Sequence, residues 1–210
     1  MIDEVKIESN LVRFKELIAK DNRSEQLLDM YERRWSEQLL IAPASGRKHY
    51  HNCFPGGYLD HILRVYDLSV QMTKTFMENN GQIDFTPEEM RFAALHHDLG
   101  KLGDNDSAPY YIEETSDWHR KNQNKYYKIN DQLQVMEPTH RGLAILSEEG
   151  IRLTQTEWLS ILLADGLYQE GNSYYLMNNS YPYPMKTQLP NIIHAADKMA
   201  SDIERGNSRF

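Results

Sequence analysis

The sequence contains one cysteine, Cys53, in 210 residues, which excludes an internal disulfide and favours a reducing compartment. It also lacks an excess of basic residues: 23 Lys and Arg against 31 Asp and Glu give a net charge of −8, unfavourable for gripping a long polyanion. No apolar run approaches the about 18 residues of a membrane span, and the start lacks a secretory signal. We therefore expect a soluble, cytoplasmic protein without membrane partners.

No internal repeat, linker or low-complexity segment interrupts the chain, and its length fits one domain, residues 1–210. Apolar residues recur at helical spacing and predict two helices before residue 44. Asn22 and Glu25 predict a capping box for the second of them. We expect residues 1–44 to flank the functional core.

Three later helix starts can be read from the sequence. Thr86-Pro87-Glu88-Glu89 combines a hydroxyl cap, a proline in the first turn and acidic residues at the positive end of the helix dipole. Thr154 and Glu157 form a second capping-box pattern, and Leu189-Pro190 begins the last predicted helix. These patterns predict an all-α fold.

An apolar run, Ala93-Ala94-Leu95, leads into His97-Asp98 near a glycine-punctuated helix end. An imidazole nitrogen and a carboxylate oxygen can both bind a divalent metal ion. Lys101 lies one turn beyond His97 and is predicted to stand near the metal as a cation for an anionic substrate.

Two further segments can supply the missing ligands. His61 follows a Gly-Gly turn, and we expect it in the first turn of the next helix. Asp197 interrupts an apolar helical stretch, where an unpaired carboxylate would be unfavourable to bury. A bound cation would supply its partner.

The order His61, His97-Asp98, Asp197 resembles the HD-domain superfamily of metal-dependent phosphohydrolases over about residues 45 to 205. The Gly-Gly-x-Leu-x-His core is most similar to HD domains of 3′-5′ exoribonuclease-like and nucleotide phosphohydrolase proteins. The resemblance implies an all-α HD-domain helical bundle, with residues 45–205 as its metal-binding core.

Two nitrogen and two oxygen ligands suit Mn²⁺, Fe²⁺, Co²⁺ or Ni²⁺ and also allow Mg²⁺ or Zn²⁺. The resemblance implies metal-assisted hydrolysis, with Asp98 and Lys101 in the catalytic site and His140 or Asp165 orienting or deprotonating water. Related members carry His-His-Gly where this chain has Ala164-Asp165-Gly166. One ion is expected, and a second is left open.

Residues 104–135 contain two short β-prone runs, which predict a β-hairpin or an ordered lid. Between them, Trp118 could stack on a base while Arg120 and Lys121 meet phosphate. A solvated hairpin tip explains the same residues.

Other histidines are open to simpler interpretations. His49 and His51 are either surface loop residues or substrate contacts. His96 is expected to pack, because the resembled family has an apolar residue there. His194 lies three residues before Asp197 on the same helix face and is expected to support the site.

The expected function is therefore hydrolysis of a nucleotide or similar small phosphoester. The alternatives are a 3′-5′ exonuclease or phosphodiesterase on single-stranded nucleic acid and, from another class, a di-iron oxygenase of HD type. The oxygenase requires additional histidine ligands that Ala164-Asp165 does not fully supply. A nucleotide sensor is disfavoured because all four ligands are present. The sequence leaves the oligomeric state open.

Overall fold

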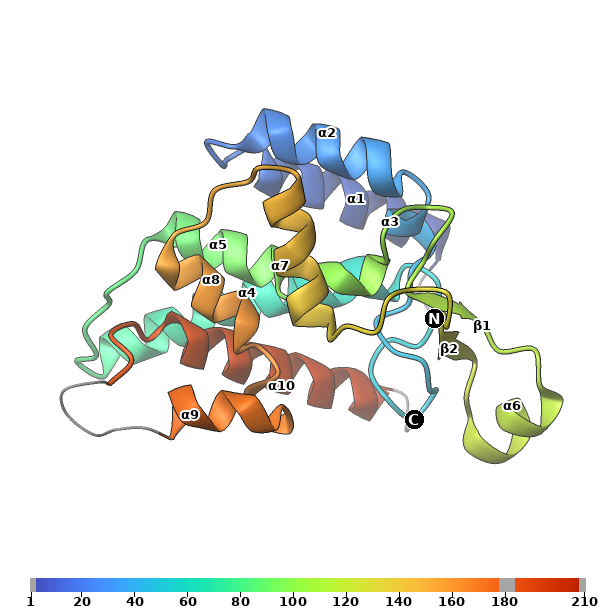
Figure 1. Cartoon of the computed structure of the whole chain (residues 1–210). Coiled ribbons are helices and arrows are strands. Elements are labelled where there is room, and N and C mark those ends of the chain that lie inside the picture. The colour runs from blue at the N-terminus through green and yellow to red at the C-terminus, as the bar shows by residue number, and fades with distance from the viewer. Residues whose placement is uncertain (1–2, 178–183, 208–210) are drawn as a thin grey trace.

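The computed structural model describes residues 3–177 and 184–207, and Figure 1 shows that this part of the chain is mostly helical. Its paired strands form one two-stranded sheet. The all-α expectation is confirmed at this level. None of the described helices has the length and apolar character needed to cross a membrane. The helices that build the body are α1 (Glu4–Ile18), α2 (Ser24–Trp35), α3 (Gln38–Ile41), α4 (Gly57–Glu78), α5 (Pro87–His96), α7 (Pro138–Glu148), α8 (Gln155–Leu162) and α10 (Leu189–Asn207).

Two clusters of buried apolar residues hold these helices together. The first joins α1 and α2 to α4, α5, α7 and α8, with Trp35 and Leu59 fully buried. Burying a side chain of this kind contributes about 1.5 to 3 kcal/mol. The second cluster joins α4, α5 and α10 through Val65, Ala93 and Ile193, and α4 and α10 lie side by side in Figure 1. The junction of these three helices carries the candidate site.

Two of the predicted helix starts are confirmed as reciprocal capping boxes, at Thr86 with Glu89 and at Thr154 with Glu157. The final helix begins at Leu189 as expected.

The predicted cap at Asn22 is wrong. Helix α2 begins at Ser24 with Arg23 at the N-cap position and no side-chain cap. The carboxylate of Asp21 accepts hydrogen bonds from the backbone N–H and the guanidinium of Arg23. This turn therefore closes around Asp21, and the helix starts after it.

The predicted strands pair as β1 (Tyr111–Glu113) and β2 (Tyr127–Ile129), with Tyr111 opposite Ile129 in an antiparallel register. The connection is a short helix, α6 (Asp117–Gln123), and not a simple hairpin tip. Figure 1 shows this insertion extending from one end of the helical body.

The insertion is tied to the loop before α4 by backbone hydrogen bonds. Lys48 N donates to Asn124 O at 2.8 Å, and Tyr126 N donates to Gly46 O at 3.0 Å. The loop that leads to His51 is thus braced by the insertion. Whether the insertion closes over a substrate stays a prediction.

Candidate metal centre

His61 reaches the site because two glycines start α4. Gly56 has a φ of 79°, which favours glycine, and a Cβ on Gly57 would lie 2.2 Å from Asn52 O. The helix begins at Gly57, so His61 is in its second turn and not, as expected, in the first. Its side chain is completely buried.

The His97-Asp98 pair occupies the junction between α5 and the 3-10 helix η1 (Leu99–Leu102). Because the chain leaves the α-helix here, both side chains can turn toward α4 and α10. Both are buried. Asp197 comes from the middle of α10, with its side chain 20% exposed.

His61, His97 and Asp197 lie on helix faces that also carry residues of the second core cluster. Side chains four residues apart on a helix lie on the same face. Each of the three lies four residues from a member of the α4, α5 and α10 cluster: His61 from Val65, His97 from Ala93 and Asp197 from Ile193. Packing of the helices therefore also sets the spacing of the polar groups.

All four predicted ligands meet at this junction. His61 Nε2 lies 3.1 Å from Asp197 Oδ1 and 3.6 Å from Asp98 Oδ2. His97 Nε2 lies 3.7 Å from Asp98 Oδ2 and 4.0 Å from Asp197 Oδ1. Ligands bound at about 2.0 to 2.2 Å from one ion are themselves about 3 to 4 Å apart, so these separations suit a shared cation.

The two imidazoles are oriented through their other nitrogens. Nδ1 of His61 donates to Glu204 Oε2 at 3.0 Å, and Nδ1 of His97 donates to Ala94 O at 2.9 Å. With Nδ1 as the donor, a neutral ring presents a lone pair at Nε2. Both Nε2 atoms are buried; that of His61 faces Asp197 Oδ1 at 3.1 Å, and that of His97 has no hydrogen-bond partner among the described residues. This arrangement fits a metal ion between the imidazoles and the carboxylates.

The electrostatics also favour a positive charge here. Burial by itself would lower the pKa of His61, but the charges of Glu204 and Asp197 outweigh it and raise the pKa to about 10. Burial would raise the pKa of Asp197, but His61 holds it well below its usual range. Without a metal, a proton on His61 balances the carboxylates, and a divalent cation could take its place.

Lys101 and Asp165 complete the polar surroundings. Lys101 Nζ lies 2.6 Å from Asp98 Oδ2; burial would lower its pKa, but the charge of Asp98 outweighs this and raises it. Asp165 follows α8, and burial together with the charge of Asp98 raises its pKa. Asp165 is thus electrostatically coupled to the centre.

Tyr111 of β1 lies within electrostatic reach of Lys101 and Asp98. Burial raises the pKa of Tyr111 to about 12, so its hydroxyl stays protonated. Nothing in the local sequence around Tyr111 indicates that it lies near the candidate site.

The remaining predicted site residues lie on α6 and in the first turn of α7. His140 is exposed near the start of α7, and Trp118 is 60% exposed on α6. Lys121 is exposed on α6, whereas Arg120 donates to Glu114 O. In residues 3–177 and 184–207, none of these side chains hydrogen-bonds or ion-pairs with the four ligands. Their roles in substrate binding or catalysis stay predictions.

The other histidines divide clearly. His96 is buried, donates from Nδ1 to Phe92 O at 2.7 Å and stacks on the Phe92 ring, as expected for a packing residue. Nδ1 of His194 donates to Ala164 O at 2.7 Å, beside Asp165. His49 is exposed.

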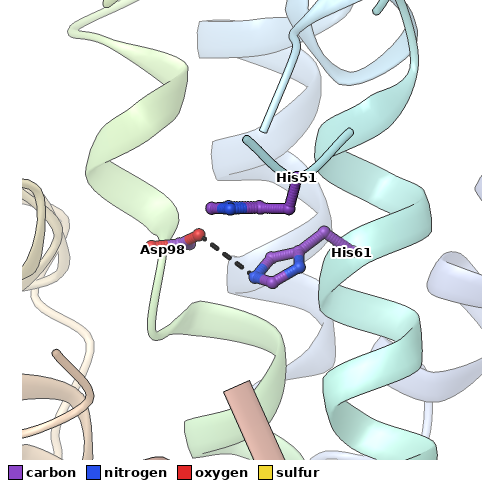
Figure 2. Close-up of side chains that lie close together, drawn as sticks. All are labelled: His51, His61 and Asp98. Atoms are coloured by element: carbon purple, nitrogen blue, oxygen red, sulfur yellow. Dashed lines mark ion pairs between the residues drawn. The ribbon is translucent and has the colours of Figure 1, made fainter. Parts of the chain in front are cut away.

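His51 is the residue that the sequence left undecided and the structure places at the site. Its ring centroid lies 4.7 Å from that of His61, and Figure 2 shows both rings beside Asp98. Glu204, one further partner of His61, was not anticipated at all, although it lies seven residues, two helical turns, after Asp197.

Comparison of the chain with protein-family models, curated proteins and solved structures found no match.

Proposed function

We propose that this chain is a metal-dependent phosphohydrolase of the HD-domain type that acts on a nucleotide or a similar small phosphoester. The observation that carries the proposal is the meeting of two buried imidazoles and two carboxylates, with the Nε2 atoms of His61 and His97 facing the carboxylate oxygens of Asp98 and Asp197. A cation bound between these groups would give each imidazole nitrogen and each carboxylate a partner of opposite polarity. The HD-type order of the same four residues supports the choice of reaction.

His61, His97, Asp98 and Asp197 would hold the divalent ion. When bound, such an ion supplies a Lewis acid for a phosphoryl oxygen and lowers the pKa of water at the site. The remaining requirements, charge compensation and proton transfer, fall to side chains of this chain.

Lys101 is placed to offset negative charge on the phosphoryl oxygens. Its ammonium group is held beside Asp98, so it enters the reaction already oriented. Asp165 is our choice for accepting the proton of the attacking water at a carboxylate oxygen, because a raised pKa makes it a better base near neutral pH. The exposed His140 is the less favoured base.

A small substrate is favoured by the net charge of −8, which would repel a long nucleic acid. On α6, Trp118 and Lys121 are exposed and can meet a base and a phosphate, whereas Arg120 is engaged with Glu113 and Glu114. A nucleotide therefore matches the available groups better than a polymer does.

The test is release of phosphate, pyrophosphate or triphosphate from a panel of ribo- and deoxynucleotides with added Mn²⁺. We expect turnover by the wild type and its loss in Asp98→Ala. Lys101→Ala should retain metal and lose about 10²- to 10³-fold in kcat, the usual effect of removing a charge-stabilising group. Asp131→Ala, which removes an exposed carboxylate, is the matched control and should keep full activity.

An active, metal-replete Asp98→Ala protein would contradict the proposal. Cleavage restricted to single-stranded oligonucleotides would favour the exonuclease. Iron in the protein and oxygen consumption, without any phosphate release, would favour the oxygenase.

A further inference from the structure

His51 belongs to the loop before α4 and lies against the candidate metal centre. A ring nitrogen of His51, a ring nitrogen of His61 and a carboxylate oxygen of Asp98 lie within 4.8 Å of one another. Figure 2 shows the His51 ring beside the Asp98 carboxylate and the His61 ring. Asp98 in turn lies near Nε2 of His97, so His51 adjoins the same cluster.

Neither nitrogen of His51 has a hydrogen-bond partner in the part of the chain that the structure describes, although both are buried. Every neutral imidazole has one donor and one acceptor, and leaving both unmade in a buried position is unfavourable. His61, His96 and His97 differ, because each uses its Nδ1 in a hydrogen bond. A ligand could therefore supply the partner that the ring nitrogens of His51 lack.

The backbone around His51 is held in place on both sides. Ser45 Oγ donates to His51 O at 2.6 Å. The next residue, Asn52, has a φ of 41°, and its side chain donates to Asp60 Oδ2 at 3.1 Å. Ala44 N donates to Asn52 O at 3.1 Å. A residue positioned this firmly is suited to ligand binding, because little conformational entropy remains to be lost.

We propose that His51 is a fifth protein ligand of the ion held by His61, His97, Asp98 and Asp197. The inference rests on the metal centre proposed above, and not on the reaction. Three imidazoles and two carboxylates would leave one position of an octahedral ion for water or a phosphoryl oxygen. The additional imidazole favours Mn²⁺, Fe²⁺, Co²⁺, Ni²⁺ or Zn²⁺ over Mg²⁺, which prefers oxygen ligands.

The test uses Co²⁺, because its visible absorption reports the number and type of ligands. The full chain is titrated with Co²⁺ by calorimetry and by absorption, without any substrate. His51→Ala should weaken Co²⁺ binding by at least about 10- to 100-fold, which is the loss typical of removing a residue that only hydrogen-bonds a metal ligand. It should also change the absorption spectrum. His49→Ala, an exposed histidine of the same loop, should match the wild type in both measurements.

Two further variants guard against a folding effect. His51→Gln preserves side-chain size and polarity and should show the same loss of Co²⁺ affinity. His51→Gly should regain the wild-type spectrum when free imidazole is added, since imidazole can occupy the space of the lost ring. Circular dichroism of each variant checks that its helices are intact.

The outcomes separate this inference from the proposed function. Equal Co²⁺ affinity and an identical spectrum in wild type and His51→Ala would overturn the role of His51 while leaving a four-ligand centre. A loss specific to the His51 variants supports the role, even if no phosphoester is hydrolysed. Failure of the wild type to bind Co²⁺ would overturn both proposals.

Discussion

Glu204 shows how one side chain can organise a site without reaching its centre. It is buried on α10, where Oε2 accepts from His61 Nδ1 at 3.0 Å and Oε1 accepts from Arg64 Nε at 2.9 Å. The carboxylate holds the imidazole in the orientation that points Nε2 at Asp98 and Asp197. It also increases the basicity of the ring, which strengthens a metal bond.

Glu204→Gln should therefore weaken Co²⁺ or Mn²⁺ binding by about 10- to 100-fold while the helices remain folded. The amide retains one acceptor but removes the negative charge beside His61. Calorimetric titration gives the affinity, and circular dichroism confirms the fold. Asp202→Asn is the control, because this half-exposed carboxylate lies two residues earlier on the same helix. Unchanged metal affinity in Glu204→Gln would contradict the orienting role.

At the scale of elements, the turn between α1 and α2 is joined to α8 by one arginine. The Arg23 guanidinium pairs with Asp21 at 2.8 Å and with Glu157 at 2.7 Å, and it lies 3.9 Å from the centre of the Phe92 ring. Both carboxylates are almost completely buried. Helices α2, α5 and α8 are thus connected through Arg23.

Asp21→Asn tests this connection through its pH dependence. Burial would raise the pKa of Asp21, but hydrogen bonds from Arg23 outweigh it and lower the pKa. A carboxyl whose pKa is lowered in the folded state stabilises the fold at pH values above its unfolded-state pKa of about 3.9. This stabilisation is lost as the pH falls through the folded-state pKa. We expect the Asp21→Asn substitution to reduce the free energy of unfolding by about 1.5 to 3 kcal/mol near pH 7 and by a smaller amount below about pH 4.

Urea unfolding of wild type and variant between pH 3 and pH 7 measures the difference. Asp131→Asn, a substitution of an exposed carboxylate, should show no such difference. A loss that is independent of pH would mean that the charge of Asp21 contributes nothing, and that the substitution acts through packing.

At the scale of the whole molecule, the candidate metal centre connects segments that are far apart in the chain. Its predicted ligands come from α4, from the end of α5 and from α10, which are held together by the second core cluster. An ion that binds only the folded state must stabilise all three helices together.

Metal should therefore raise the melting temperature. At a free Mn²⁺ or Co²⁺ concentration 100 times Kd, the stabilisation is about 2.7 kcal/mol, and a chelator should reverse it. In Asp197→Ala the melting temperature should not respond to metal, because that variant lacks one carboxylate ligand. Differential scanning calorimetry measures both proteins. An equal rise in Asp197→Ala would place the stabilising ion elsewhere.

Much of the helical framework was predictable because its signals are local. The hydroxyl cap predicted at Thr86 and the capping box predicted at Thr154 each depend on neighbouring residues, and the structure confirms both. The cap at Asn22 failed because the neighbouring Asp21 forms its hydrogen bonds with Arg23, and Arg23 in turn pairs with Glu157 of a distant helix. A local pattern cannot anticipate that long-range competition.

The sequence proposes His61, His97, Asp98 and Asp197 as metal ligands because their residue types and settings suit a metal ion. Their convergence depends on the packing of α4, α5 and α10, and only the tertiary structure decided it. The same packing placed His51 and Glu204 against His61, although neither has a local pattern that distinguishes it from an ordinary loop or helix residue. Helix starts follow from neighbouring residues, whereas contacts between distant segments follow from how whole faces bury apolar surface.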